Sequence, residues 1–88
     1  MTYLFIYNSS LGSEEDVIAL LNDYDGICSW RTDIPGTFFL QSDKTAESIA
    51  EYIINTKPNS RFFVVEISHN RQGWLPKNAW SFIKGTDK

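Results

Sequence analysis

Two strand–helix–strand patterns, joined by a tight turn, predict a single α+β domain for this chain of 88 residues. An apolar strand and an amphipathic helix precede the turn, and a second helix and strand follow it. At the turn, Pro35 presets the φ angle of the second position, and Gly36 supplies the positive φ that a type II turn requires. Because crossover connections are right-handed by default, both halves close into a ferredoxin-like βαββαβ sandwich. This fold has an antiparallel four-stranded sheet with two helices on one face, and the chain adds a short C-terminal helix.

The first half is a strand over residues 3–7 and a helix that starts after Ser13. Every residue of the strand is apolar or aromatic, which is typical of a strand at the centre of a sheet. Leu4 and Ile6 point to one face of the sheet, and the aromatic residues between them point to the other. The helix has acids in its first turn and an apolar stripe: Val17, Leu20, Leu21 and Tyr24.

The hairpin strands cover residues 27–31 and 37–41. A second helix follows, capped by Asp43 or Thr45, and Pro58 stops it. The last strand covers residues 61–67, and Pro76 suits the first position of a helix that runs to about Lys84. The domain therefore spans residues 1–88, with a helical tail over about 74–85.

One face of the predicted sheet has no helix over it. If Leu4 and Ile6 face the helices, Tyr3, Phe5 and Tyr7 form an aromatic patch on this open face. A patch of that size is normally covered by a partner, a ligand or the chain's own tail. Either the apolar residues of the tail or a second copy of the chain could cover it.

Composition and charge narrow the class of protein. Cys28 and His69 are the only residues of their kinds, so no internal disulfide can form and a structural zinc site lacks ligands. No apolar run reaches the about 18 residues of a membrane span, and the chain starts without a basic lead, so we expect a cytoplasmic protein. The net charge of −3 argues against a general nucleic-acid binder. Residues 48–88 nevertheless hold six bases and three acids, and such asymmetry can mark a partner surface.

No enzyme motif stands out. Ser9, Ser10 and Ser13 lack the flanking glycines of a hydrolase nucleophile elbow. Cys28 could pair with His69, but a lone cysteine is far more often a buried packing residue. We assign no catalytic residue, no metal ligand and no cofactor, and we favour a protein that is not an enzyme.

A first resemblance is to RNA-recognition domains. Residues 4–8, Leu-Phe-Ile-Tyr-Asn, resemble the first-strand signature of these domains. Their third strand begins with a basic residue and alternates glycine with aromatics that stack on bases. Residues 36–41 lack the basic residue and the second glycine.

A broader resemblance covers nearly the whole chain. It rests on the succession YLFIYNSS, GICSWRTDIPGTFFLQSD, TAESIAEYI and RFFVVEIS, with Trp30 in the aromatic second strand. With these segments the chain resembles the small VapD- and SinR-type proteins, which are relatives of the small non-integrase subunit of the CRISPR adaptation complex. The closing GWLPKNAW is similar to the tail of small bacterial proteins of this shape.

This resemblance implies a ferredoxin-like homodimer in a bacterial or phage defence or toxin–antitoxin setting. In some members it also implies a metal-dependent endonuclease, in which an aspartate at the end of the first strand holds Mg²⁺. The present chain has Asn8 at that place, and a neutral amide lacks the negative charge that a hard cation favours. Asp33 is the nearest alternative carboxylate, and its turn position explains it without chemistry.

Bases and rings interleave in the tail. His69, Arg71, Lys77 and Lys84 alternate with Trp74 and Trp80. Together they could bind a single strand or another phosphate-rich partner. Alternatively, the two tryptophans pin the terminal helix to the domain, and the bases lie in solvent.

We therefore predict a small binding or regulatory protein that acts through protein contacts as a homodimer. A metal-dependent nuclease and a nucleic-acid-binding module that uses the basic aromatic tail are the alternatives. The candidate binding residues are Asn8, Ser9, Arg31, His69, Arg71, Trp74 and Lys77.

Overall fold

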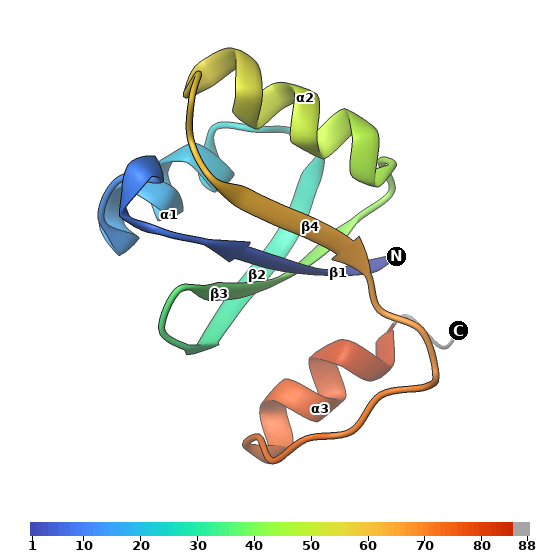
Figure 1. Ribbon diagram of the computed structural model, residues 1–88. Helices are drawn as coiled ribbons and strands as arrows, with labels where there is room; N and C mark the ends of the chain where they lie inside the picture. Colours follow the sequence, from blue (N-terminus) through green and yellow to red (C-terminus); the bar gives the residue numbers. More distant parts are fainter. Residues whose placement is uncertain (86–88) are drawn as a thin grey trace.

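The computed structural model describes residues 1–85, which form one sheet with helices on both of its faces (Figure 1). The strands lie in the order β2-β3-β1-β4, and every neighbouring pair is antiparallel. The predicted ferredoxin-like α+β fold is therefore confirmed. The elements are β1 (Thr2–Tyr7), the 3₁₀ turn η1 (Ser9–Leu11), α1 (Glu14–Asn22), β2 (Ile27–Ile34), β3 (Thr37–Ser42), α2 (Ala46–Thr56), β4 (Phe62–Glu66) and α3 (Lys77–Lys84).

The hairpin between β2 and β3 turns at Pro35 and Gly36, as predicted. Gly36 has a φ of 75°, which is the left-handed conformation that the second central residue of a type II turn needs. β2 is longer than predicted and continues to Ile34, because its pairing with β3 resumes after a register shift. The hydroxyl of Thr32 bridges this irregular stretch by donating to the carbonyl of Thr37 at 2.7 Å.

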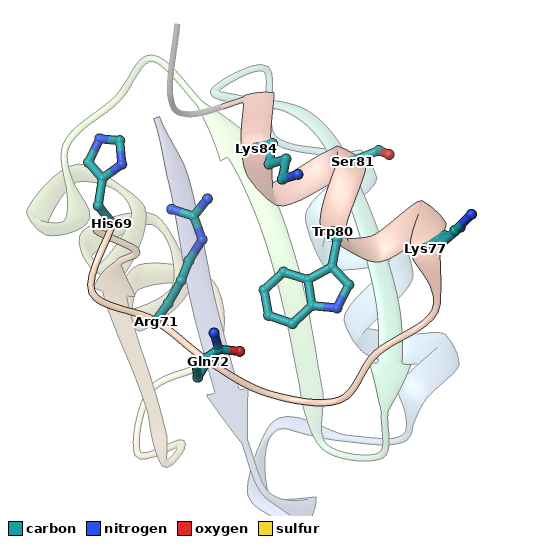
Figure 2. Close-up of a pocket in the computed structure, with 7 residues that line it drawn as sticks. All are labelled: His69, Arg71, Gln72, Lys77, Trp80, Ser81 and Lys84. Carbon is teal, nitrogen blue, oxygen red and sulfur yellow. The ribbon is translucent and has the colours of Figure 1, made fainter.

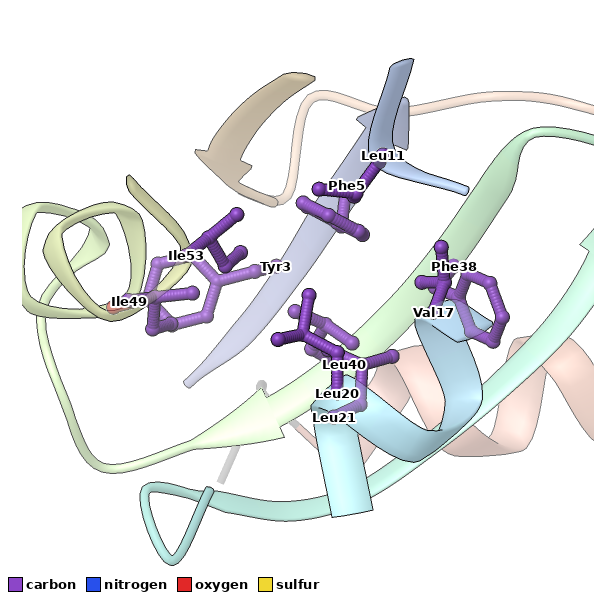
Figure 3. Close-up of a cluster of buried hydrophobic side chains, with 10 residues drawn as sticks. All are labelled: Tyr3, Phe5, Leu11, Val17, Leu20, Leu21, Phe38, Leu40, Ile49 and Ile53. Atoms are coloured by element: carbon purple, nitrogen blue, oxygen red, sulfur yellow. The ribbon is translucent and has the colours of Figure 1, made fainter. Parts of the chain in front are cut away.

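The main core lies between the sheet and the helices α1 and α2, and Figure 3 shows its ten buried side chains. Tyr3 and Phe5 of β1 are buried there, whereas Leu4 and Ile6 lie on the opposite face. The interpretation that Leu4 and Ile6 face the helices is therefore wrong, and there is no patch of Tyr3, Phe5 and Tyr7 on the open face. The aromatic rings lie on the face that α1 and α2 cover, because burying a large ring removes more apolar area from water than burying an aliphatic side chain.

Side-chain caps start α1 and α2. Ser13 Oγ accepts the backbone N–H of Asp16 at 3.2 Å, and Asp16 Oδ2 accepts that of Ser13 at 2.9 Å. The hydrogen bond from the Ser13 backbone, followed by the contribution of the Ser13 side chain, lowers the pKa of the Asp16 carboxyl. α2 is capped by Thr45, whose hydroxyl accepts the backbone N–H of Ser48. Of the two predicted candidates, Thr45 is the cap and Asp43 is not.

α3 lies on the open face of the sheet and covers part of it (Figure 1). Its residues Ala79 and Ile83 are buried against the sheet. The side-chain amide of Gln41 in β3 donates to the carbonyl of Phe82 at 2.8 Å and fixes the end of the helix. The helix starts at Lys77, one residue later than predicted, and Pro76 is its N-cap.

The other part of the open face stays uncovered by the described residues. Ile6 is 43% exposed, Phe63 61% and Val65 39%. Ile6 pairs directly with Phe63 across β1 and β4, and Val65 follows on the same face of β4. We call these three side chains the apolar strip. None of the helices in residues 1–85 is both long enough and apolar enough to span a membrane.

The positive φ of Gly36 generates a first prediction. The change Gly36→Ala should lower the free energy of unfolding by about 1–2 kcal/mol, since a Cβ is disfavoured in the left-handed region. Its Cβ would meet only the carbonyl oxygen of Tyr7, at an ordinary 3.4 Å, so the backbone angle is the main cost. Gly73→Ala is the control because its Cβ has no neighbour closer than 3.9 Å and its φ is not positive. Urea unfolding of both variants measures the difference, and equal stabilities would contradict the turn geometry.

Two adjacent isoleucines of α2 provide a second prediction. Ile53 is 0% exposed in the core, whereas Ile54 is 52% exposed. Ile53→Ala should therefore cost about 2–5 kcal/mol of stability through lost burial and a residual cavity. Ile54→Ala should change it by less than about 1 kcal/mol, because alanine also favours the helix. Thermal melts of the two variants would reject this orientation of α2 if Ile54→Ala proved the more damaging change.

Candidate functional site

A hollow of 590 Å³ lies between α3 and the loop that follows β4 (Figure 2). The loop and the helix each supply part of its wall. We call it the basic hollow, and its lining residues are His69, Arg71, Gln72, Lys77, Trp80, Ser81 and Lys84.

The helical wall of the basic hollow follows from the amphipathic pattern of α3. Lys77, Trp80, Ser81 and Lys84 recur at the spacing of one helix face. Ala79 and Ile83 lie on another face of α3 and are buried against the sheet. Burial of these two apolar side chains therefore leaves Lys77 and Lys84 at the wall of the hollow.

The loop wall is a compact turn. Arg71 donates its backbone N–H to the carbonyl of His69 at 2.9 Å, and its guanidinium Nη1 donates to the carbonyl of Ser68 at 3.0 Å. Figure 2 shows the Arg71 side chain rising between the loop and α3. The loop thus holds a guanidinium opposite the lysines of the helix.

The basic hollow is positively charged on a chain of net charge −3. Arg71, Lys77 and Lys84 carry positive charge, and the described lining includes no carboxylate. A concave surface lined by one sign of charge attracts ligands of the opposite sign. The arrangement is suited to binding an anion.

Trp80 separates the basic hollow from an apolar crevice of 270 Å³ beneath the tail. The crevice reaches Leu4 and Phe39 on the sheet and Leu75 on the loop. Trp80 is half-buried between the two spaces, whereas the neighbouring Trp74 is 99% exposed. The two tryptophans of the tail therefore differ: Trp80 packs against the domain, and Trp74 projects from it.

The predicted binding residues separate into distinct places. His69, Arg71 and Lys77 come together in the basic hollow, and Trp74 lies nearby at the rim of the crevice. Asn8 and Ser9 lie elsewhere, at the turn after β1. The side-chain carbonyl of Asn8 accepts the backbone N–H of Ser10 at 2.9 Å and its hydroxyl at 2.5 Å, so this amide caps η1.

Arg31 lies on the edge strand β2 and has a partner of its own. Its guanidinium donates from Nε and Nη2 to the two carboxylate oxygens of Asp33, both at 2.7 Å. These hydrogen bonds raise the pKa of Arg31 above its ordinary value. Arg31 and Asp33 therefore neutralise each other in a local ion pair, and neither residue lines the basic hollow.

No group of three or more histidine, cysteine or acidic side chains gathers in residues 1–85 in a way that could hold a metal ion. Cys28 is exposed, so the interpretation of this cysteine as a buried packing residue is wrong. It lies on the edge strand β2, where the pairing with β3 shifts register between Ile27 and Ser29. Cys28 and His69 line different hollows.

Sequence reasoning placed Lys84 and Trp80 among the bases and rings of the tail but left them out of the final candidate set, and it did not single out Ser81. Their spacing from Lys77 on a short helix was the signal that could have found them. The apolar strip was also missed, because both faces of β1 are apolar and the pattern does not say which face the helices cover.

Comparisons with protein-family models, with curated proteins and with solved structures found no match to this chain. The resemblance to VapD- and SinR-type proteins therefore stays an expectation.

The two tail tryptophans provide a third prediction. Trp80→Ala should lower the free energy of unfolding by about 2 kcal/mol, because the substitution removes a large ring that is half-buried against the domain. Trp74→Ala, which removes the same ring from an almost fully exposed position, should change it by less than about 0.5 kcal/mol. Urea unfolding followed by far-UV circular dichroism measures both. An unchanged midpoint for Trp80→Ala would mean that this ring does not anchor α3.

Proposed function

We propose that this chain is a small binding protein that works without catalysis, through protein contacts, as a homodimer. The observation that carries the proposal is the apolar strip beside the unpaired edge of β4. Exposed apolar side chains next to a free strand edge form the kind of surface that associates with another chain.

The backbone of β4 supports association at this edge. Asn8 donates its N–H to the carbonyl of Arg61, and Ile67 donates to that of Thr2. Residues that bond to one neighbour alternate, in an antiparallel ladder, with residues whose polar groups point the other way. Phe62, Val64 and Glu66 therefore direct their backbone N–H and C=O groups away from β1. β4 contains no proline that would block another strand from pairing.

A second copy fits this edge because β4 is complementary to itself. A two-fold axis through Val64 would pair Phe62 of one copy with Glu66 of the other through backbone hydrogen bonds. Phe63 would then lie directly opposite Val65 of the second copy on the open face. The apolar strips of both copies would merge into one surface across an eight-stranded sheet.

Charges also agree with this pairing. Arg61 precedes β4, and Glu66 ends it. In the two-fold register, Arg61 of each copy comes within one position of Glu66 of the other. Arg61 lies opposite Ile67 and Glu66 opposite Phe62 in this register, so no like charges are paired across the interface.

The oligomeric state of the full chain tests this proposal. We expect sedimentation at twice the chain mass of 10.1 kDa for the natural protein at micromolar concentration. Phe63→Lys should raise the dimer dissociation constant at least tenfold, because each interface would bury two unpaired ammonium groups. The charge is added at an exposed position, so the circular dichroism spectrum should not change. Ile54→Lys is the matched control, since Ile54 is similarly exposed on α2.

A rescue experiment tests the register. Val65→Glu should weaken the dimer as Phe63→Lys does. The double variant Phe63→Lys/Val65→Glu places opposite charges across the two-fold axis and should recover part of the affinity. A monomeric natural protein at 100 µM, or a dimer that only Ile54→Lys disrupts, would reject the proposal.

A further inference from the structure

We propose that the basic hollow binds a nucleotide unit, with its phosphates against Arg71, Lys77 and Lys84 and its base against Trp80. A free nucleotide and one unit of a single strand present the same phosphate and ring, and the experiment below distinguishes these two sources. The inference does not depend on the proposed dimer, because it uses α3 and the loop after β4 rather than the edge of β4.

The first argument is the gathering of charge. The chain has more acids than bases, yet three permanent cations and the histidine line one hollow whose described lining contains no acid. His69 and Arg71 lie on the loop and Lys77 and Lys84 on α3, so the docking of the helix beside the loop brings the charges together. Placing like charges side by side costs free energy, and a bound polyanion offsets this cost.

The second argument is spacing. Lys77 and Lys84 lie seven residues apart on the same face of α3, which is about 10.5 Å along the helix axis. They can therefore contact different phosphates of one ligand. Arg71 rises from the loop across the hollow from α3, and a planar guanidinium can donate two parallel hydrogen bonds to one phosphate.

The third argument is the ring between the cations. Figure 2 shows the Trp80 indole extending from α3 into the space between the helix and the loop, with Lys77 and Lys84 on either side of it along the helix. An aromatic face beside positive charges is the arrangement on which single-stranded bases stack. Gln72 and Ser81 add neutral hydrogen-bonding groups to the same wall, where they can contact the edge of a base or a sugar.

The size of the basic hollow agrees with such a ligand. Its 590 Å³ lies within the about 300–1,000 Å³ that small-molecule and cofactor sites occupy. A simple inorganic anion would leave most of this space and the indole unused. The combination of volume, ring and cations therefore favours a nucleotide over phosphate alone.

The test titrates the full-length protein with a fluorescein-labelled ten-residue oligo-dT strand and follows fluorescence anisotropy. Two or three phosphate contacts should make the affinity fall roughly tenfold between 50 and 200 mM salt. The double variant Lys77→Gln/Lys84→Gln should weaken binding at least tenfold and flatten this salt dependence. Lys57→Gln is the control, because it removes an exposed lysine at the end of α2, on the other face of the sheet.

Trp80→Phe tests the ring without removing the packing that Trp80→Ala would lose. It should weaken oligo-dT binding at least threefold, because a smaller ring stacks less well, while the melting temperature changes little.

Competition with ADP separates the two sources of the ligand. Displacement of the strand by ADP supports a site for a free nucleotide, and binding of the strand without displacement supports a site for a polymer.

Two results would overturn the proposal. The first is no salt-sensitive binding of oligo-dT or ADP, or an equal loss in Lys57→Gln and in the double lysine variant. The second is competition by inorganic pyrophosphate as strong as that by ADP, together with unchanged binding in Trp80→Phe. The hollow would then be a general anion site and not a nucleotide site.

Discussion

The burial of the aromatic face of β1 is the constraint on which the rest of this structure depends. Tyr3 and Phe5 fill the space between the sheet and the helices α1 and α2. Since side chains alternate along a strand, this burial directs Leu4 and Ile6 to the other face. A central strand that is apolar on both faces is stabilised when both faces are buried. The helices α1 and α2 bury only one of them.

The tail supplies the second cover and leaves it incomplete. α3 buries Ala79 and Ile83 over the part of the sheet that includes Leu4 and Phe39, while Ile6 stays exposed beside β4. Partial cover creates two different surfaces on one face. Over one part of the sheet, α3 and the loop before it form the basic hollow on their polar side. The tail does not cover the other part, where the apolar strip lies beside the edge of β4.

These two surfaces differ in the chemistry that they can recognise. The apolar strip and the strand edge offer apolar contact area and backbone hydrogen bonds, which suit another protein chain. The basic hollow offers charge and one aromatic face, which suit a phosphate-bearing ring. Trp80 lines both spaces beside the tail: it packs over the apolar crevice and forms part of the wall of the basic hollow. Fold stability and the proposed ligand binding are therefore coupled at this residue.

The sequence by itself determined what depends on neighbouring residues: the order of the elements, the Pro35-Gly36 turn and the cap at Ser13. It also marked the tail as basic and aromatic. Only the tertiary structure decided which face of β1 the helices cover, because a strand of period two that is apolar on both sides fits either way. The meeting of His69 and Arg71 with Lys84, and the separation of Asn8 and Arg31 from them, were likewise decided by packing between distant segments. Such juxtapositions depend on how α3 docks on the sheet, and no local pattern records that contact.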